Sequence, residues 1–176
     1  RDELVAAKAE LLELLSLAAQ PATTSDEPIP PADRSQPIPL SSGQQRMWFL
    51  EEFEGGTTVY NIPWAMRLRG PLNSAALEQA FRDLISRHES LRTRFRTDDG
   101  SPWQDIVEHM SFELHRESLP GADADTLQAH LEHLSRHIFD LEEGPLLRAT
   151  LIHLGDDDHV LSIVMHHIVS DAWSMD

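Results

Sequence analysis

Val160-Leu-Ser-Ile-Val-Met-His166-His167-Ile-Val-Ser-Asp171-Ala-Trp173-Ser174 is the stretch that decides the fold. From Val160 to Met165 apolar residues fill both alternating sets of side chains, which predicts a strand buried on both faces. Successive side chains of a strand point to opposite faces, so the two histidines cannot both face one cavity. We therefore expect one histidine to serve a site and the other to pack on the far side.

The exit from this strand is expected to be tight, because Ser170 and Asp171 are residue types that suit turns and helix caps. A histidine at a strand end is more often a packing residue than a catalyst, so the motif alone does not decide its role. A structural zinc site is disfavoured, because adjacent strand histidines diverge and the chain has no cysteine. The choice between these interpretations depends on the rest of the chain.

Composition limits the classes of function. The 176 residues are 40% hydrophobic and 25% charged, as in an ordinary globular domain. A net charge of −16 argues against nucleic acid or an anionic membrane as a partner. We find no signal peptide and no apolar stretch that would span a bilayer, so we expect a cytoplasmic protein. Arg1 in place of Met suggests a segment of a longer polypeptide.

Three regions are expected along the chain. Residues 1–20 contain an amphipathic helix, over 2–17, with an apolar stripe that includes Leu4, Leu11 and Leu15. Residues 21–39 form a proline-rich linker, and residues 40–176 form a folded lobe. The helix either packs on its own domain or docks onto an upstream partner protein, and the sequence favours neither.

The lobe is predicted to be α+β, with helices packed on a mostly antiparallel or mixed sheet. Helices are expected over 40–50, around the apolar face from Leu77 to Ile85, and over 127–138. Strands are expected over 60–69, 92–96, 103–108, 112–117, 146–154 and from 160 onward. Pro63 places the first of these strands at a sheet edge or begins it.

Three segments carry a family resemblance. They are Ser41-x-Gly43-Gln44-x-Arg46-Met47-Trp48-x-Leu50, Arg87-His88-Glu89-x-Leu91-Arg92-Thr93-x-Phe95 and Met165-His166-His167-x-x-Ser170-Asp171-Ala172-Trp173-Ser174. In this order and spacing they resemble the first three core motifs of condensation domains of non-ribosomal peptide synthetases. The resemblance covers about residues 38–176, with Gly43 in place of the usual Ala and Ala172 in place of the usual Gly.

The resemblance implies a chloramphenicol-acetyltransferase-like fold. Condensation domains have two such lobes in a V, with the active site between them. This chain resembles the N-terminal lobe only, so we expect it to be truncated and inactive alone. The implied reaction belongs to secondary metabolism, such as antibiotic biosynthesis. An acceptor amine attacks a donor acyl or peptidyl thioester, and phosphopantetheine arms of carrier proteins hold both substrates. No cofactor is expected to bind directly, and donor carriers, acceptor carriers and adjacent synthetase domains are the expected partners.

The resemblance also assigns roles to residues. His167, the second histidine, is the candidate base or positioner of the amine, and His166 is expected to be structural. Asp171 completes the candidate catalytic set and is expected to form an ion pair with Arg87, or alternatively with Arg92. Ala172 and Trp173 are expected to shape the site. Ile168-Val169-Ser170 mildly favours an all-L donor type.

Three alternatives remain open. The chain could be another acyltransferase with the HxxxD motif that uses coenzyme A, although the second motif argues against this class. It could be an epimerization domain. It could instead be a non-catalytic interaction module, whose N-terminal helix docks a partner.

Overall fold

The computed structural model describes residues 30–171 and Ser174. It divides into two units, residues 1–33 and residues 34–176, and every described helix and strand lies in the second unit. The predicted helix over 2–17, most of the predicted linker, Ala172 and Trp173 lie outside the described residues. The described residues of the first unit, 30–33, have exposed side chains.

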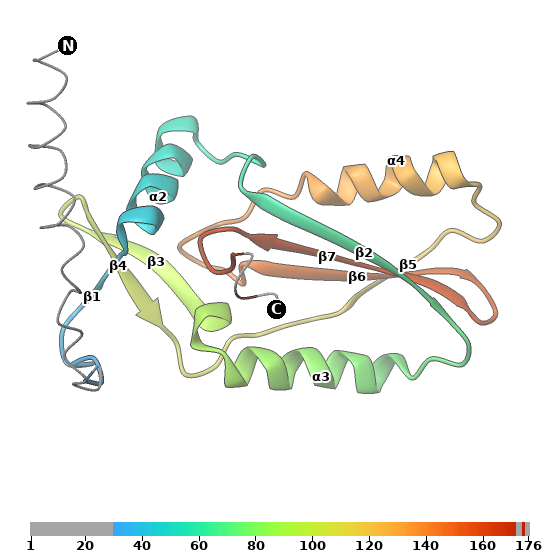
Figure 1. The fold of residues 1–176 in the computed structure, drawn as a ribbon, viewed down its shortest axis with the longest axis horizontal. Coiled ribbons are helices and arrows are strands. Elements are labelled where there is room, and N and C mark those ends of the chain that lie inside the picture. The colour runs from blue at the N-terminus through green and yellow to red at the C-terminus, as the bar shows by residue number, and fades with distance from the viewer. Residues whose placement is uncertain (1–29, 172–173, 175–176) are drawn as a thin grey trace, which may run out of the picture. The chain divides into compact units, whose positions relative to one another are not determined.

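The second unit has the predicted α+β composition. Its elements are β1 (Ile38–Pro39), α2 (Ser42–Glu54), β2 (Asn61–Arg69), α3 (Ser74–Arg87), the short 3-10 helix η1 (Glu89–Arg92), β3 (Thr93–Asp98), β4 (Ser101–Ile106), β5 (His115–Ser118), α4 (Ala124–Ser135), β6 (Leu147–Gly155) and β7 (Asp158–His166). The described strands form a three-stranded sheet in the order β1-β4-β3 and a four-stranded sheet in the order β2-β7-β6-β5. Figure 1 shows α3 and α4 on opposite sides of the four-stranded sheet.

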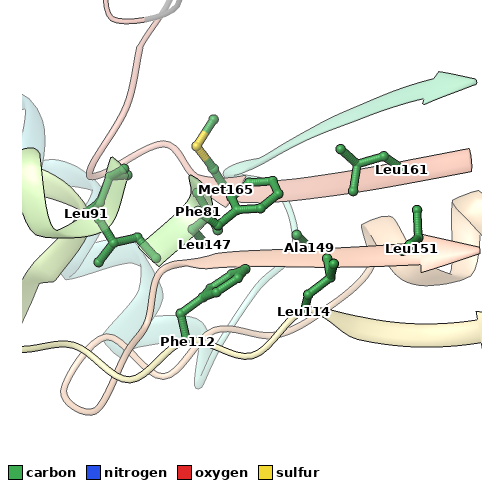
Figure 2. Packing of buried hydrophobic residues seen from close by; sticks show 10 residues of the cluster. Phe81, Leu91, Phe112, Leu114, Leu147, Ala149, Leu151, Leu161 and Met165 are labelled. Carbon is green, nitrogen blue, oxygen red and sulfur yellow. The ribbon is translucent and has the colours of Figure 1, made fainter. Parts of the chain in front are cut away.

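Strand β7 is the interior strand that the sequence predicts. It runs antiparallel to β2 on one side and to β6 on the other. Leu161 and Met165 belong to the core on the α3 side, together with Phe81 (Figure 2). Val160 lies on the other face and packs with Leu134 of α4. Because helices cover both faces, an almost continuous apolar run is stable in this position.

A second core lies where β7 ends. Phe95 of β3 packs there with Val164 of β7 and with Ile168 and Val169, which follow that strand. Met47 and Trp48 of α2 pack against the same cluster. This core therefore holds α2, the three-stranded sheet and the segment after β7 together, and these are the elements that carry the three motifs.

Several element limits differ from the prediction. Residues 34–39, expected in the linker, contact the lobe: Arg34 pairs with Glu89, and β1 pairs with β4. Strand β5 covers His115–Ser118 in place of the predicted 112–117, because its parallel pairing with β6 begins at His115. Helix α4 ends at Ser135, and Ile138 is 58% exposed.

The predicted edge position of β2 is confirmed, because β2 is the outermost strand of its sheet. Pro63 lies within it, opposite Val164. Proline has no N–H to donate, and an edge strand tolerates this because one side of its backbone faces no partner strand.

Candidate active site

The candidate site begins with the turn that follows β7. The backbone N–H of His166 donates to the carbonyl of Leu146 at 3.0 Å, and that of His167 donates to the carbonyl of Tyr60 at 2.8 Å. The chain then turns back, and the N–H of Val169 donates to the carbonyl of His166 at 3.2 Å. The two histidines are thus fixed between the ends of the neighbouring strands β2 and β6.

His167 is exposed, and its ring is oriented by its own turn. Its Nδ1 lies 2.8 Å from the carbonyl oxygen of Ser170. A carbonyl can only accept a hydrogen bond, so Nδ1 of the neutral ring carries the proton. The other ring nitrogen, Nε2, then holds a lone pair that can accept a proton.

His166 has the opposite arrangement. Its side chain is 1% exposed, its Nδ1 accepts the N–H of Ile168 at 3.1 Å, and its Nε2 lies 3.0 Å from Oε1 of Glu51. Since Nδ1 accepts, Nε2 carries the proton and donates to the carboxylate. Burial lowers the pKa of His166, and this effect exceeds the raising effect of Glu51. The structure therefore places His166 inside the fold and His167 at the surface, while their chemical roles stay predictions.

The first motif contacts the third through one side chain. Ser41 caps α2 in a capping box, in which its hydroxyl accepts the N–H of Gln44 and its own N–H donates to Oε1 of Gln44 at 2.9 Å. The amide nitrogen of Gln44 then donates to the carbonyl of Ile168 at 3.2 Å. The helix cap thereby holds the turn that carries His167.

The second motif spans the C-terminal end of α3, η1 and the start of β3. Its buried members are Leu91, Thr93 and Phe95, and the hydroxyl of Thr93 donates to the carbonyl of Glu89 at 2.7 Å. A pocket of about 240 Å³ lies between this segment and the third motif. Its lining includes His88, Ser90, Leu91, Val169, Ser170 and Ser174. The second and third motifs therefore meet at one cavity on the α3 side of the sheet.

The carboxylate of Asp171 forms hydrogen bonds within its own turn. The carboxylate of Asp171 accepts the backbone N–H of Ser174 at 2.9 Å and its hydroxyl at 2.7 Å. Arg92 donates to the carbonyl of Val107 at 2.6 Å and to Glu89 at 3.3 Å. Arg87 is exposed at the end of α3. The ion pair of Asp171 with Arg87, or alternatively with Arg92, stays a prediction.

Sequence reasoning missed Glu51, whose carboxylate is the partner of His166. A signal was present, because Glu51 follows Met47 by four residues and so shares its helix face. Met47 packs against the second core, and an acidic residue on that face calls for a buried partner. The partner itself lies 115 positions away in the chain, which no local pattern reports.

In the described part of the chain, no three side chains of His, Asp or Glu gather as a metal ion would require. None of the helices described there has the length and apolar character needed to cross a membrane.

Comparisons with known proteins agree with the resemblance that the three motifs indicate. The condensation domain family matches residues 34–176. One of the subunits of linear gramicidin synthase from Brevibacillus parabrevis is 42% identical over 175 residues, covering 97% of this chain and 3% of the relative. Bacitracin synthase 2 of Bacillus licheniformis is 40% identical over 163 residues, covering 93% of this chain and 6% of the relative.

Comparison with solved structures supports the same fold. The X-domain in its complex with OxyB from teicoplanin biosynthesis matches with a TM-score of 0.74 and 35% identity, over 83% of this chain and 31% of that one. The first condensation domain of the calcium-dependent antibiotic synthetase matches with a TM-score of 0.71 and 24% identity, over 81% of this chain and 36% of that one. The fold is thus the predicted α+β lobe of chloramphenicol-acetyltransferase type. The chain belongs to the condensation domain family of non-ribosomal peptide synthetases.

Proposed function

We propose that this chain is part of a condensation domain that joins two thioester-bound substrates through a peptide bond. The acceptor amine attacks the donor carbonyl, the C–N bond forms, and the C–S bond to the donor phosphopantetheine breaks. Donor and acceptor carrier proteins present the substrates, and adjacent synthetase domains are the other partners. Matching relatives are named linear gramicidin synthase and bacitracin synthase 2, which supports this reaction class.

The observation that carries the proposal is the orientation of the His167 ring. Its Nδ1–H is engaged by the Ser170 carbonyl, so Nε2 is left as the acceptor on an exposed side chain. An α-amino group has a pKa of about 8, so a useful fraction is neutral at physiological pH. The amine becomes an ammonium as the C–N bond forms, and Nε2 accepts that proton or holds the amine in place.

The test is His167→Ala in the complete condensation domain, with both carriers loaded. Product formation is expected to fall by ~10²–10⁴-fold, the usual contribution of a general base. His109→Ala is the matched control, because the His109 side chain is 88% exposed and its Nε2 lies 3.8 Å from Oε1 of the neighbouring Glu108. Equal rates for His167→Ala and the control would contradict the proposal.

We further propose that the 176-residue chain alone does not catalyse condensation. The chain spans 36% of the solved condensation domain chain, so it lacks surfaces that the longer chain contributes. Loss of positioning for the two substrates can raise the barrier by ~7–11 kcal/mol. Turnover by the purified chain near the rate of the complete domain would refute this.

A second candidate function is a non-catalytic binding module. It is favoured by the likeness to an X-domain solved in complex with another protein, OxyB. Residues 2–17, the predicted amphipathic helix, could serve the same purpose toward an upstream partner. Deletion of residues 1–20 separates the possibilities: lost binding with unchanged melting temperature indicates docking, whereas a large loss of stability indicates a packed helix. Binding of loaded carriers without product would favour the binding module over the enzyme.

A further inference from the structure

Glu51 is a buried carboxylate on a helix whose neighbouring acids are exposed. Its side chain is 5% exposed, while Glu52 and Glu54 on the same helix face solvent. Burying a carboxylate is costly unless hydrogen bonds replace its water. Oε1 of Glu51 receives the Nε2–H of His166 at 3.0 Å, and Oε2 receives the backbone N–H of Thr57 at 2.9 Å. Both oxygens are therefore engaged.

Through the ring of His166, Glu51 also acts on the turn that follows β7. Because Nε2–H of His166 is directed at Glu51, the other nitrogen, Nδ1, is free to accept the N–H of Ile168. The rings of Tyr60 and Phe139 flank His166, with centroids 6.0 and 6.1 Å away. The imidazole thus has a fixed rotamer and tautomer, and it holds the backbone of the turn from the inner side.

Side chains of α2 fix both backbone polar groups of Ile168, the N–H and the carbonyl. Glu51 acts on the N–H through His166, and Gln44 donates directly to the carbonyl. His167 is the residue just before Ile168, and its own N–H is held by Tyr60. The direction of the His167 imidazole therefore depends on a turn whose inner side is fixed by side chains of α2.

We propose that Glu51 is a positioning residue that acts through His166 to fix the turn carrying His167. It does not contact the reacting atoms. The inference rests on the proposed function, and it adds a residue to the machinery that the third motif alone does not contain. The neutral state of His166, whose pKa burial lowers, agrees with this geometry because a protonated ring could not accept the Ile168 N–H.

The two donors, His166 and Thr57, require a side chain at position 51 that has two acceptor oxygens and the length of glutamate. A glutamine at this position offers one acceptor and turns an NH₂ group toward either His166 or Thr57, both of which are donors. An aspartate keeps two acceptors but is shorter by one methylene. Glu51→Gln therefore breaks the arrangement with almost no change of volume, and Glu51→Asp is the second variant should Glu51→Gln fail to fold. Glu52→Gln is the matched control, since it removes the same charge from the exposed neighbour.

The first readout needs no activity. Histidine ¹⁵N spectra of the chain are expected to show His166 protonated on Nε2 and His167 protonated on Nδ1. Glu52→Gln should leave both patterns unchanged, whereas Glu51→Gln or Glu51→Asp should alter the His166 pattern and mix the tautomers of His167. Unchanged His167 signals in these variants would overturn the proposal.

The second readout is kinetic and uses the complete domain with loaded carriers. Glu51→Gln is expected to lower kcat about 10- to 100-fold with little change in KM, the size of effect expected for a misplaced catalytic group. In a His167→Ala background the same change should cost nothing further, because its effect passes through His167. An equal loss in both backgrounds would show a purely structural role and sink the inference. If the unaltered domain makes no product while the ¹⁵N spectra respond as expected, the proposed function fails and the positioning of His167 stands.

Discussion

Replacing Phe95 with alanine should be the most damaging single change in the second core. Phe95 belongs to the second motif, is 0% exposed, and packs with Ile168 and Val169 of the turn after β7. Its backbone N–H also donates to the carbonyl of Leu141 at 2.8 Å, so the β-strand position is fixed while the side chain is removed. The variant therefore creates a cavity and leaves the backbone little freedom to close it.

The expected cost follows from two contributions. Removing a fully buried large apolar side chain loses about 1.5–3 kcal/mol of transfer free energy. A residual cavity of about 60 Å³ at ~24 cal/mol per Å³ adds about 1.4 kcal/mol. The free energy of unfolding should therefore fall by roughly 3–4.5 kcal/mol, within the usual range for such substitutions.

Urea denaturation of the chain, followed by circular dichroism, measures this difference. Phe53→Ala is the control, because it is the same chemical change on α2 at a residue that is 79% exposed. The control should change the free energy of unfolding by no more than about 0.5 kcal/mol. A loss below about 1 kcal/mol for Phe95→Ala, or a loss equal to that of the control, would refute the packing argument.

Three other predictions concern the same lobe. Asn61 donates to the carbonyls of Ser135 and His137, both at 2.7 Å, so Asn61→Ala should cost about 1–3 kcal/mol in urea denaturation, and an unchanged midpoint would contradict this. Gly43→Ala should raise the free energy of unfolding by about 0.5–1 kcal/mol, because the added Cβ meets no atom closer than 3.9 Å within α2; a loss would show hidden crowding. Burial lowers the pKa of His166, so below about pH 6.5 the unfolded chain binds a proton that the folded chain does not. Stability should therefore fall as the pH drops from about 7.5 to about 5.5, and a rise over that range would disprove the linkage.

The sequence by itself determined the local elements and predicted the place of the candidate site. An apolar run without alternation marked β7 as an interior strand, and it lies between β2 and β6. The strict alternation of strand side chains predicts that the two histidines face opposite ways, and His166 is buried while His167 is exposed. Three ordered motifs indicated the family, which the match over residues 34–176 confirms.

Only the tertiary structure decided which distant residues meet. It joins Glu51 to His166 and Gln44 to Ile168, and it separates β3 and β4 from the four-stranded sheet. It also joins Arg92 to the carbonyl of Val107 and to the carboxylate of Glu89. The physical reason is the separation along the chain over which each interaction acts. Helix and strand periodicity follow from neighbours within a few residues, whereas hydrogen bonds and ion pairs across elements depend on how those elements pack, and many pairings fit the same local pattern.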